Sequence, residues 1–386
     1  MLIRKAFKFR IYPNVEQQEK LSAQFGCARF VYNHYRRVRE EYYHETGTGL
    51  NYNDCAQDLS DRLKPEFAWL KDADSQVIQQ VLKDLDAAYQ NFFKGRADYP
   101  KFKRKHDKQS IRYPQRFKFS DKQIYLPKVG WVNCVYHRSM TGTAKNVTVS
   151  RTKTGKFFVS VQCEYETVEP TQKDGAVGID LGLKHFAVLS DGTKIDNPKC
   201  LKRSERRLKI RQRRLSRARK GSNGRAKQRQ RVAMIHEKVA NQRKNFHHQL
   251  SRYLVNNFGS IGLETLNVKG MVKNHNLAKS ISDVGWAQFV QFVTYKAGWA
   301  GTEIVRHDRF FASSKTCSDC GAVNQSLVLS DRMWVCASCG AVHDRDTNAA
   351  INLKPKLLRE SQKVTPVETR EVVRHSARKP NAFRLG

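Results

Sequence analysis

Two pairs of closely spaced cysteines constrain this chain more than any other feature of its sequence. Cys317 and Cys320 form one C-x-x-C pair, and Cys336 and Cys339 form the second after fifteen residues, 321 to 335. Four thiolates at this spacing are typical of a zinc ribbon that closes around one Zn²⁺ ion. Since four protein ligands leave no open coordination position, we predict a structural site and not a catalytic one. Free thiols or a disulfide pair are the alternatives.

The charge of the chain restricts the kind of partner. It has 71 Lys and Arg residues against 36 Asp and Glu residues, a net charge of +35, and 39% of its 386 residues are hydrophobic. This composition allows two or three domains with real cores and excludes a disordered basic tail. Such a cationic surface is typical of proteins that neutralise polyphosphate, so we expect a nucleic-acid partner. A basic surface that serves only solubility is the alternative.

Cysteine usage and hydropathy indicate a compartment. Five of the nine cysteines are scattered along the chain, which suits a reducing cytoplasm. No stretch approaches the roughly 18 consecutive apolar residues of a membrane span, and the first twelve residues lack the apolar core of a signal peptide. We expect a cytoplasmic protein without a membrane partner.

About half of the excess charge lies in one segment, Lys199–Lys244. It holds 19 Lys or Arg residues and only two acidic ones. Leucines recur every seven residues, the run breaks at 221–224, and helical spacing then resumes, so we predict two helices, each with a narrow apolar seam and a broad cationic face. A solvated face is the alternative, but like charges four residues apart repel unless a polyanion compensates them. The candidate nucleic-acid contacts are Lys202, Arg203, Arg206, Arg207, Arg211, Arg213, Arg214 and Arg217.

The hydrophobic pattern divides the chain into two parts. Residues 3–11 alternate apolar with basic side chains, and similar short runs continue to about residue 166, which predicts an antiparallel sheet or small barrel. Helical spacing over 15–93, with a break at 47–49, predicts a helical unit inserted into that sheet. After a polar linker the strands at 176–180, 186–190, 261–264 and 302–305 alternate with helical segments, an α/β pattern.

Three acidic residues stand at places where catalytic carboxylates are common. Asp180 and Glu264 each end a strand, and Asp346 lies at a helix start. If they converge, their charges repel unless Mg²⁺ or Mn²⁺ ions occupy the site, and two such ions hydrolyse a phosphodiester by in-line displacement. The alternatives are a turn-forming Asp180, a surface Glu264, and a helix cap at Asp344 or Asp346.

Several motifs resemble one family in the same order along the chain. The chain is similar to TnpB, the transposon-encoded RNA-guided nucleases related to type V CRISPR effectors. The resemblance rests on Tyr12-Pro13, Arg29-Phe30-Val31-Tyr32-Asn33, Gly178-Ile179-Asp180-Leu181-Gly182-Leu183-Lys184, Ile261-Gly262-Leu263-Glu264, Ser313-Ser314-Lys315-Thr316-Cys317-Ser318-Asp319-Cys320-Gly321 and Asp344-Arg345-Asp346-Thr347-Asn348-Ala349-Ala350. It runs from about residue 3 to residue 353.

The resemblance implies a multidomain fold and specific roles. It implies an α/β RNase H-like (RuvC) nuclease domain with an inserted zinc ribbon, plus an N-terminal β-barrel (wedge) carrying an inserted helical recognition unit. The catalytic triad falls on Asp180, Glu264 and Asp346, the second aspartate of its motif. Arg332 helps to place the scissile strand. Tyr52 and Gln79 contact the motif that flanks the target, and Ser75 stands where relatives carry a longer polar side chain.

The resemblance also implies domain boundaries. The expected units are a wedge at 1–14 and 97–168, a recognition unit at 15–96, a nuclease domain at 169–312 and 344–358, a zinc ribbon at 313–343 and a flexible tail at 359–386.

We therefore expect an RNA-guided DNA endonuclease of a transposable element that cuts beside a short flanking motif in the prokaryotic nucleoid. Its expected partners are guide RNA, double-stranded target DNA and the RNA–DNA heteroduplex, which the dense cations of Lys199–Lys244 suit. The alternatives are a guided DNA-binding repressor that does not cut, a guide-independent RNase H-like resolvase or strand transferase, and a zinc-ribbon RNA-binding protein without chemistry.

Overall fold

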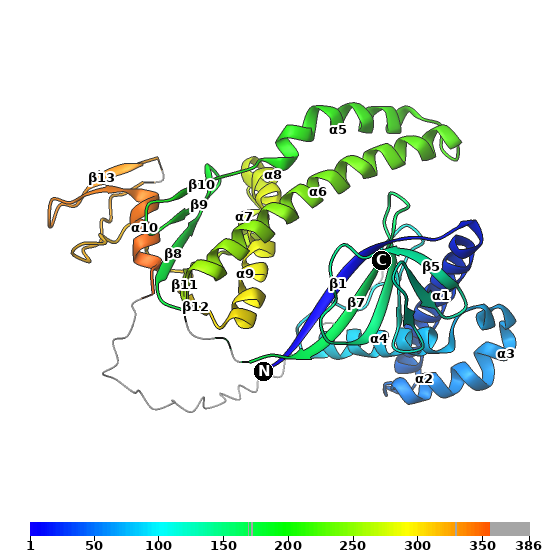
Figure 1. The fold of residues 1–386 in the computed structure, drawn as a ribbon. Coiled ribbons are helices and arrows are strands. Elements are labelled where there is room, and N and C mark those ends of the chain that lie inside the picture. The colour runs from blue at the N-terminus through cyan, green and yellow to red at the C-terminus, as the bar shows by residue number, and fades with distance from the viewer. Residues whose placement is uncertain (169, 171–172, 329, 356–386) are drawn as a thin grey trace.

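The computed structural model describes the chain except residues 169, 171–172, 329 and 356–386. The predicted tail at 359–386, and the end of the predicted nuclease domain at 356–358, lie outside the described residues. The described chain forms an N-terminal lobe around one sheet, a C-terminal lobe around a second sheet, and a small hairpin domain at the far end (Figure 1).

The N-terminal sheet has seven antiparallel strands in the order β2-β6-β7-β1-β5-β4-β3. The opening strand pairs with the much later β7 on one side and β5 on the other, as in Phe7 opposite Val161 and Tyr12 opposite Asn133. The strands are β1 (Leu2–Tyr12), β2 (Gln109–Tyr113), β3 (Lys118–Phe119), β4 (Gln123–Leu126), β5 (Gly130–Val135), β6 (Thr143–Arg151) and β7 (Phe157–Glu166).

The strand pairing departs from the predicted barrel. Within the described residues, β2 and β3 remain the edges of the ladder, so the hydrogen bonds describe an open sheet and not a closed barrel. The physical reason is that helices α1 and α4 pack beside β2, and β3 has only two residues with which to pair.

The helical unit follows β1 and returns to the sheet at β2, as the insertion predicts. Its elements are α1 (Val15–Thr46), α2 (Tyr52–Asp58), the π-helix η1 (Leu59–Leu63), α3 (Lys64–Glu66), the 3₁₀-helix η2 (Ala68–Asp72) and α4 (Ser75–Phe93). Helix α1 ends at Gly47, whose φ of 70° is left-handed, in agreement with the predicted break. Side chains from the sheet, such as Phe9, and from the helices, such as Leu21 and Leu82, form one continuous core.

The C-terminal sheet has five strands in the order β10-β9-β8-β11-β12. Strands β8, β11 and β12 run parallel, whereas β9 runs antiparallel to both β8 and β10. The strands are β8 (Ala176–Leu181), β9 (His185–Leu189), β10 (Lys194–Asp196), β11 (Ser260–Leu263) and β12 (Glu303–Arg306).

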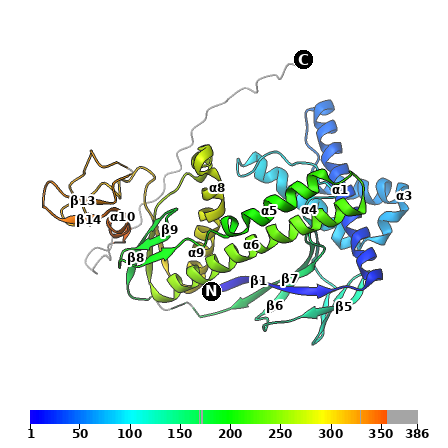
Figure 2. The same cartoon turned by 90° about the horizontal axis from the view of Figure 1, so that it is seen from above.

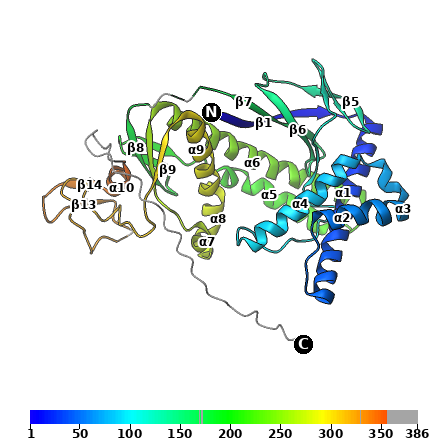
Figure 3. The ribbon, with the colours of Figure 1, turned by 90° about the horizontal axis from the view of Figure 1, so that it is seen from below.

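Helices surround this sheet, and a long helical hairpin extends from it. The helices are α5 (Cys200–Arg217), α6 (Asn223–Asn257), α7 (Val268–Met271), α8 (His275–Val284), α9 (Trp286–Ala300) and α10 (Arg345–Leu353), and a hairpin of β13 (Met333–Val335) and β14 (Val342–Asp344) precedes α10. Seen from above and from below, α5 and α6 run from the C-terminal sheet toward the N-terminal lobe (Figures 2 and 3). There Glu237 of α6 accepts hydrogen bonds from Thr154 (3.1 Å) and Lys156 (3.0 Å) of the β6–β7 turn.

The second basic helix is longer than the charge run predicted. It continues past Lys244 to Asn257 because its last third turns apolar side chains inward. His247, Leu250 and Leu254 are buried there, and Phe246 contacts Phe186 of β9 with ring centroids 4.8 Å apart.

No helix in the part of the chain that the structure describes is long and apolar enough to cross a membrane.

Candidate functional site

The register of two parallel strands brings Asp180 and Glu264 together. Ile179 of β8 lies opposite Leu263 of β11, so the next residue of each chain carries a carboxylate at the same edge of the sheet. The backbone N–H of Leu181 donates a 3.4 Å hydrogen bond to Oε1 of Glu264. The carboxyl ends of adjacent parallel strands are where the side chains of an α/β site usually converge.

Two glycines allow α10 to lie directly on these strands. A Cβ atom at Gly178 of β8 would overlap the backbone oxygen of Ala350, and a Cβ atom at Gly262 of β11 would overlap that of Leu353. Any other residue at either position would push the helix away from the sheet. The close approach holds Asp346, in the first turn of α10, near Asp180.

The two aspartates at the start of α10 have different roles in the structure. Asp344 is the N-cap, and its Oδ1 accepts hydrogen bonds from the backbone N–H groups of Asp346 (3.1 Å) and Thr347 (3.0 Å), while Lys194 pairs with its Oδ2 at 2.8 Å. Burial opposes its charge, but the hydrogen bonds from Lys194 and Thr347 outweigh burial and lower the pKa of Asp344. Asp344 is therefore engaged as the helix cap, whereas the carboxylate of Asp346 has no capping role.

The environment of Asp180 disfavours its ionised form. Burial, followed by the negative charges of Glu264 and Asp346, raises the pKa of Asp180 to about 8. Burial also raises the pKa of Glu264, against the hydrogen bond from Leu181. Groups that repel one another in this way would be stabilised by a bound cation. Among the described residues only the four cysteines already hold their ligand atoms close together, so the three carboxylates would have to draw together to share a divalent metal ion.

Arg345 and Arg332 are cations close enough to this cluster to act on Asp180, and Arg332 contacts one of its members directly. Nη1 of Arg332 lies 3.4 Å from both carboxylate oxygens of Asp346, and the Arg332 backbone oxygen accepts a 2.8 Å hydrogen bond from the N–H of Arg345. Its side chain is half exposed, so the guanidinium can also meet a ligand from solvent.

The four cysteines gather as predicted. Among the described residues they form the only group of three or more metal-ligating side chains whose ligand atoms all lie within 4.8 Å of one another. The sulfur atoms of Cys317 and Cys339 are 3.7 Å apart and those of Cys320 and Cys336 are 3.6 Å apart, too far for a disulfide. The backbone N–H groups of Cys339 and Ser338 lower the pKa of Cys336 to about 7. Despite its backbone hydrogen bond with Ala341, the neighbouring sulfur atoms raise the pKa of Cys339 to about 12, so this thiol would lose its proton only on binding a metal ion.

Sequence reasoning missed the residues that attach this cluster to α10. The side-chain nitrogens of Asn348 and Asn352 donate to the backbone oxygen of Thr316, at 2.7 and 2.6 Å, and Oδ1 of Asn348 accepts from the N–H of Ser318 at 2.9 Å. Two asparagines four residues apart after Asp344-Arg345-Asp346 are the sequence signal, since they share one helix face. His343, also missed, lies with Nε2 3.0 Å from Sγ of Cys317.

Most of the predicted nucleic-acid contacts line one exposed helix, α5. Among the described residues none of them pairs with a carboxylate; Glu205, the acidic residue of α5, pairs with Lys209 and Lys279 instead. Burial and three neighbouring arginines lower the pKa of Arg211, and the other predicted contacts are exposed, namely Lys202, Arg203, Arg206, Arg207, Arg213, Arg214 and Arg217. We call α5 and about the first two-thirds of α6, residues 200–244, the basic arm.

Tyr52 and Gln79 lie on the helical unit, far along the chain from the carboxylates. Tyr52 begins α2, and Lys83 of α4 places its ammonium 5.6 Å from the centre of the Tyr52 ring. Gln79 is exposed one turn before Lys83 on the same face of α4. Ser75 begins α4 and is exposed.

Comparison with known proteins gives matches along most of the chain. Residues 160–275 match a family described as "Probable transposase", residues 286–353 match the "Cas12f1-like, TNB domain", and residues 1–48 match a "Helix-turn-helix domain". A Streptomyces pristinaespiralis protein named "Putative RNA-guided DNA endonuclease" is 39% identical over 91% of this chain and 89% of its own. The Escherichia coli K12 protein "Putative RNA-guided DNA endonuclease InsQ" is 34% identical over 90% of this chain and 91% of its own.

A third relative supplies the family name, because the mimivirus "TnpB-like protein L79" is 33% identical over 31% of this chain and 23% of its own. The chain belongs to the TnpB family. The family resemblance found in the sequence is thus confirmed. A solved structure titled "Cryo-EM structure of the Cas12f1-sgRNA-target DNA complex" aligns with this TnpB-family chain at 14% identity and a TM-score of 0.49, covering 91% of it and 98% of the Cas12f1 chain.

Proposed function

We propose that this protein is an RNA-guided DNA endonuclease of a transposable element that cuts its target beside a short flanking motif. The observation that carries the proposal is the gathering of Asp180, Glu264 and Asp346 at one edge of the C-terminal sheet. Two relatives that match nine-tenths of the chain carry this activity in their names.

The C-terminal sheet, with α9 and α10 against it, would be an RNase H-like (RuvC) nuclease domain. Three strands joined by hairpins, followed by two parallel strands on the far side of the first, support this assignment. The zinc ribbon at 313–343 would be an insertion before the last helix of the domain.

Asp180, Glu264 and Asp346 would hold Mg²⁺ or Mn²⁺. Ions held there would supply an activated water molecule and would stabilise the leaving oxygen of a phosphodiester. Within the protein, the strand register fixes Asp180 and Glu264, and the close packing of α10 on the strands fixes Asp346. Arg332 lies beside Asp346 and would help to place the scissile strand. Cys317, Cys320, Cys336 and Cys339 would hold Zn²⁺ as a structural ion that fixes the chain just before Asp346.

The basic arm would grip guide RNA and the RNA–DNA heteroduplex formed with double-stranded target DNA. Unpaired arginines on a rigid helix suit a backbone that must be held without regard to sequence. Tyr52 and Gln79 would contact the flanking motif, in a recognition unit at 15–96 that shares its core with the wedge at 1–14 and 97–168.

The two aspartates of α10 provide a matched test. Purified Asp346→Ala protein, loaded with its co-purified RNA, should cut a matching plasmid about a thousandfold more slowly than the wild type, because losing one metal ligand removes roughly 4 kcal/mol of transition-state stabilisation. Asp344→Ala removes a helix cap worth about 1 kcal/mol and should keep most of the cleavage activity below its lowered melting temperature.

Three other outcomes of this experiment would contradict the proposal, and two of them would indicate a different function. Equal cleavage by Asp346→Ala and the wild type would refute the triad. Guided binding by the wild type without any cutting would indicate a repressor. A protein that purifies free of RNA and cuts unguided DNA would be a resolvase or strand transferase.

A further inference from the structure

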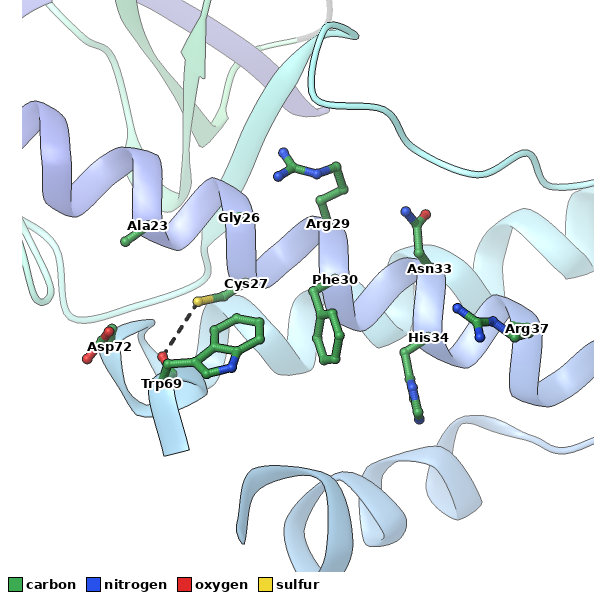
Figure 4. Close-up of a pocket in the computed structure, with 10 residues that line it drawn as sticks. All are labelled: Ala23, Gly26, Cys27, Arg29, Phe30, Asn33, His34, Arg37, Trp69 and Asp72. Carbon is green, nitrogen blue, oxygen red and sulfur yellow. Dashed lines mark hydrogen bonds between the residues drawn. The ribbon is translucent and has the colours of Figure 1, made fainter. Parts of the chain in front are cut away.

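The surface of the helical unit carries a groove that the proposed function does not use. It lies between α1 and η2, has a volume of about 580 Å³, and is drawn in Figure 4. One stripe of α1 forms its long wall, and Trp69 and Asp72 of η2 form the other. We call it the Trp69 groove; the stripe consists of Ala23, Gly26, Cys27, Phe30, His34 and Arg37.

The groove exists because its floor has no bulky side chain. A Cβ atom at Gly26 would meet no atom within 4 Å. The residue one turn earlier on the stripe is Ala23, whose side chain is also small. Trp69 stands beside this gap, with its ring centre 4.9 Å from that of Phe30 in an edge-to-face contact. Its backbone oxygen accepts a hydrogen bond from Sγ of Cys27 at 3.8 Å. The ring is therefore held in place, although 43% of the residue is exposed.

The charges around the groove are also left without partners. Arg37 is exposed and, among the residues described, forms no ion pair; Asp72 at the other end is exposed and has none either. In Figure 4, Phe30, His34 and Trp69 lie on one side of α1, whereas Arg29 and Asn33 point to the other. Arg29 is engaged there, donating to Oε1 of Gln109 at 3.1 Å. Arg37 is thus the cation available to the groove.

We propose that the Trp69 groove binds one unpaired nucleotide of the nucleic acid that the protein holds. The base stacks on the exposed Trp69 ring, Asp72 accepts a hydrogen bond from an N–H group on the edge of the base, and Arg37 contacts a phosphate. Aromatic rings interleaved with arginine are the usual platform for single-stranded nucleic acid, and a duplex would keep its bases inaccessible to such a ring. This inference rests on the proposed function, which supplies two sources of unpaired nucleotides, the guide RNA and the opened target DNA.

Four variants test the inference. Trp69→Ala removes the stack and Trp69→Phe keeps a ring. Gly26→Leu fills the groove from a position that faces open space, so this variant folds even if Trp69→Ala does not. Trp131→Ala is the matched control, because Trp131 is an equally exposed tryptophan (42%) on β5 of the same lobe.

Two binding measurements on the full-length protein separate the two sources. The first is the Kd of the RNA-free protein for its guide RNA. The second is the Kd of the guide complex for a target duplex whose strands are mismatched beside the flanking motif. We expect Trp69→Ala and Gly26→Leu to weaken one of the two by roughly 5-fold to 100-fold, the effect of losing one base–aromatic stack, with a smaller loss for Trp69→Phe and none for Trp131→Ala.

The inference is overturned if neither Kd changes for Gly26→Leu, or if Trp131→Ala weakens binding as much as Trp69→Ala. A loss in the first measurement identifies RNA as the source, and a loss only in the second identifies DNA. Cleavage by the wild type is measured in the same samples. If it fails while the binding losses persist, the endonuclease assignment is wrong and the nucleotide site stands.

Discussion

The surroundings of the Asp180 carboxyl group disfavour its ionised form. With its pKa raised to about 8 in the folded protein and near 3.8 in the unfolded chain, it keeps its proton in the folded state over this interval while the unfolded state releases it. Without a divalent cation, Asp180 therefore makes the protein progressively less stable as the pH rises from about 4 to 8. The function proposed for the site and the stability of the fold make opposite demands on this residue.

We expect Asp180→Asn to raise the melting temperature of the metal-free protein while abolishing cleavage. The amide cannot ionise, so the gain should be small near pH 5 and larger near pH 8, roughly 2–4 °C for each kcal/mol of stabilisation. Differential scanning fluorimetry with a chelator present, across that pH range, measures it. A gain that shrinks as the pH rises would contradict the raised pKa.

Single residues show how far the sequence predicts the site. The strand-end positions of Asp180 and Glu264 follow from hydrophobic patterning, and the spacing of the four cysteines predicts their gathering. The spacing of Asn348 and Asn352 marks a shared helix face, but it does not identify their backbone partners about 30 residues earlier. His343 carries no such signal, because its partner is a sulfur atom 26 residues away. The choice of Asp346 over Asp344 comes from the family resemblance. The capping hydrogen bonds of Asp344 are local, so the sequence alone allows either aspartate as the cap, and only the ion pair of Asp344 with Lys194 depends on the tertiary fold.

At the scale of elements, the position of α10 depends on the two glycines beneath it. We expect Gly178→Ala to displace α10, to destabilise the protein by about 1–3 kcal/mol, and to reduce cleavage further than the stability loss alone explains, because Asp346 moves with the helix. Thermal unfolding and guided cleavage, compared at a temperature where the variant stays folded, separate the two effects.

The control for this prediction is Gly298→Ala in α9. A Cβ atom at Gly298 would meet no atom within 4 Å, so the change should leave cleavage intact and add helix propensity. If the two alanine variants show the same unfolding and cleavage, the close packing of α10 on the strands is not what holds the carboxylates together.

The basic arm makes a prediction about salt. Replacing four exposed arginines of α5 with glutamine should lower the slope of log Kd for guide RNA against log salt concentration by about 3, because each phosphate contact to a single strand contributes about 0.7 to that slope. The replaced residues are Arg206, Arg207, Arg213 and Arg214. Fluorescence anisotropy at several salt concentrations measures the slope.

A second quadruple variant controls for net charge. This variant neutralises cations that already pair with carboxylates, so it should change the slope of log Kd against log salt concentration far less. An equal change in both variants would mean that only the net charge matters, and not where the cations lie on the surface. These residues are Arg4, Lys20, Arg62 and Arg112.

The two helices of the arm also show what the sequence pattern does not predict, namely where the second helix ends. The charge run and the glycine-containing turn predicted both helices, but the end of the second was placed at Lys244, where the charge ends. The helix goes on to Asn257 because burial of Leu250 and Leu254 against the sheet, and not charge, decides its length. A helix that changes from a solvated to a buried face has no single periodic signature.

At the scale of the whole molecule, the described chain has three separate cores, and the smallest depends on few side chains. Cys317, Leu327, Trp334 and Cys336 form the core of the cysteine hairpin, whereas the N-terminal sheet and helices share one large core. A core of this size needs a metal ion to stay folded.

We therefore expect removal of Zn²⁺ to disconnect cutting from binding. A thiol-reactive zinc chelator, followed by excess Mg²⁺, should abolish cleavage and leave the affinity for guide RNA within about twofold, because the unfolded hairpin no longer fixes the start of α10. Added Zn²⁺ should restore cutting. Loss of guide RNA affinity in parallel would mean that the hairpin also holds RNA.

The position of α10 in the chain has a consequence for the protein during its own synthesis. When a ribosome has joined the first 340 residues, the N-terminal lobe, the arm and two of the three carboxylates have already been made, while Asp346 is still to be added. With the roles proposed above, such a nascent chain would bind RNA but would lack one of the residues needed for cutting. The nuclease would be armed only after its RNA-binding surfaces have folded, which protects the DNA being transcribed nearby from an enzyme without a guide.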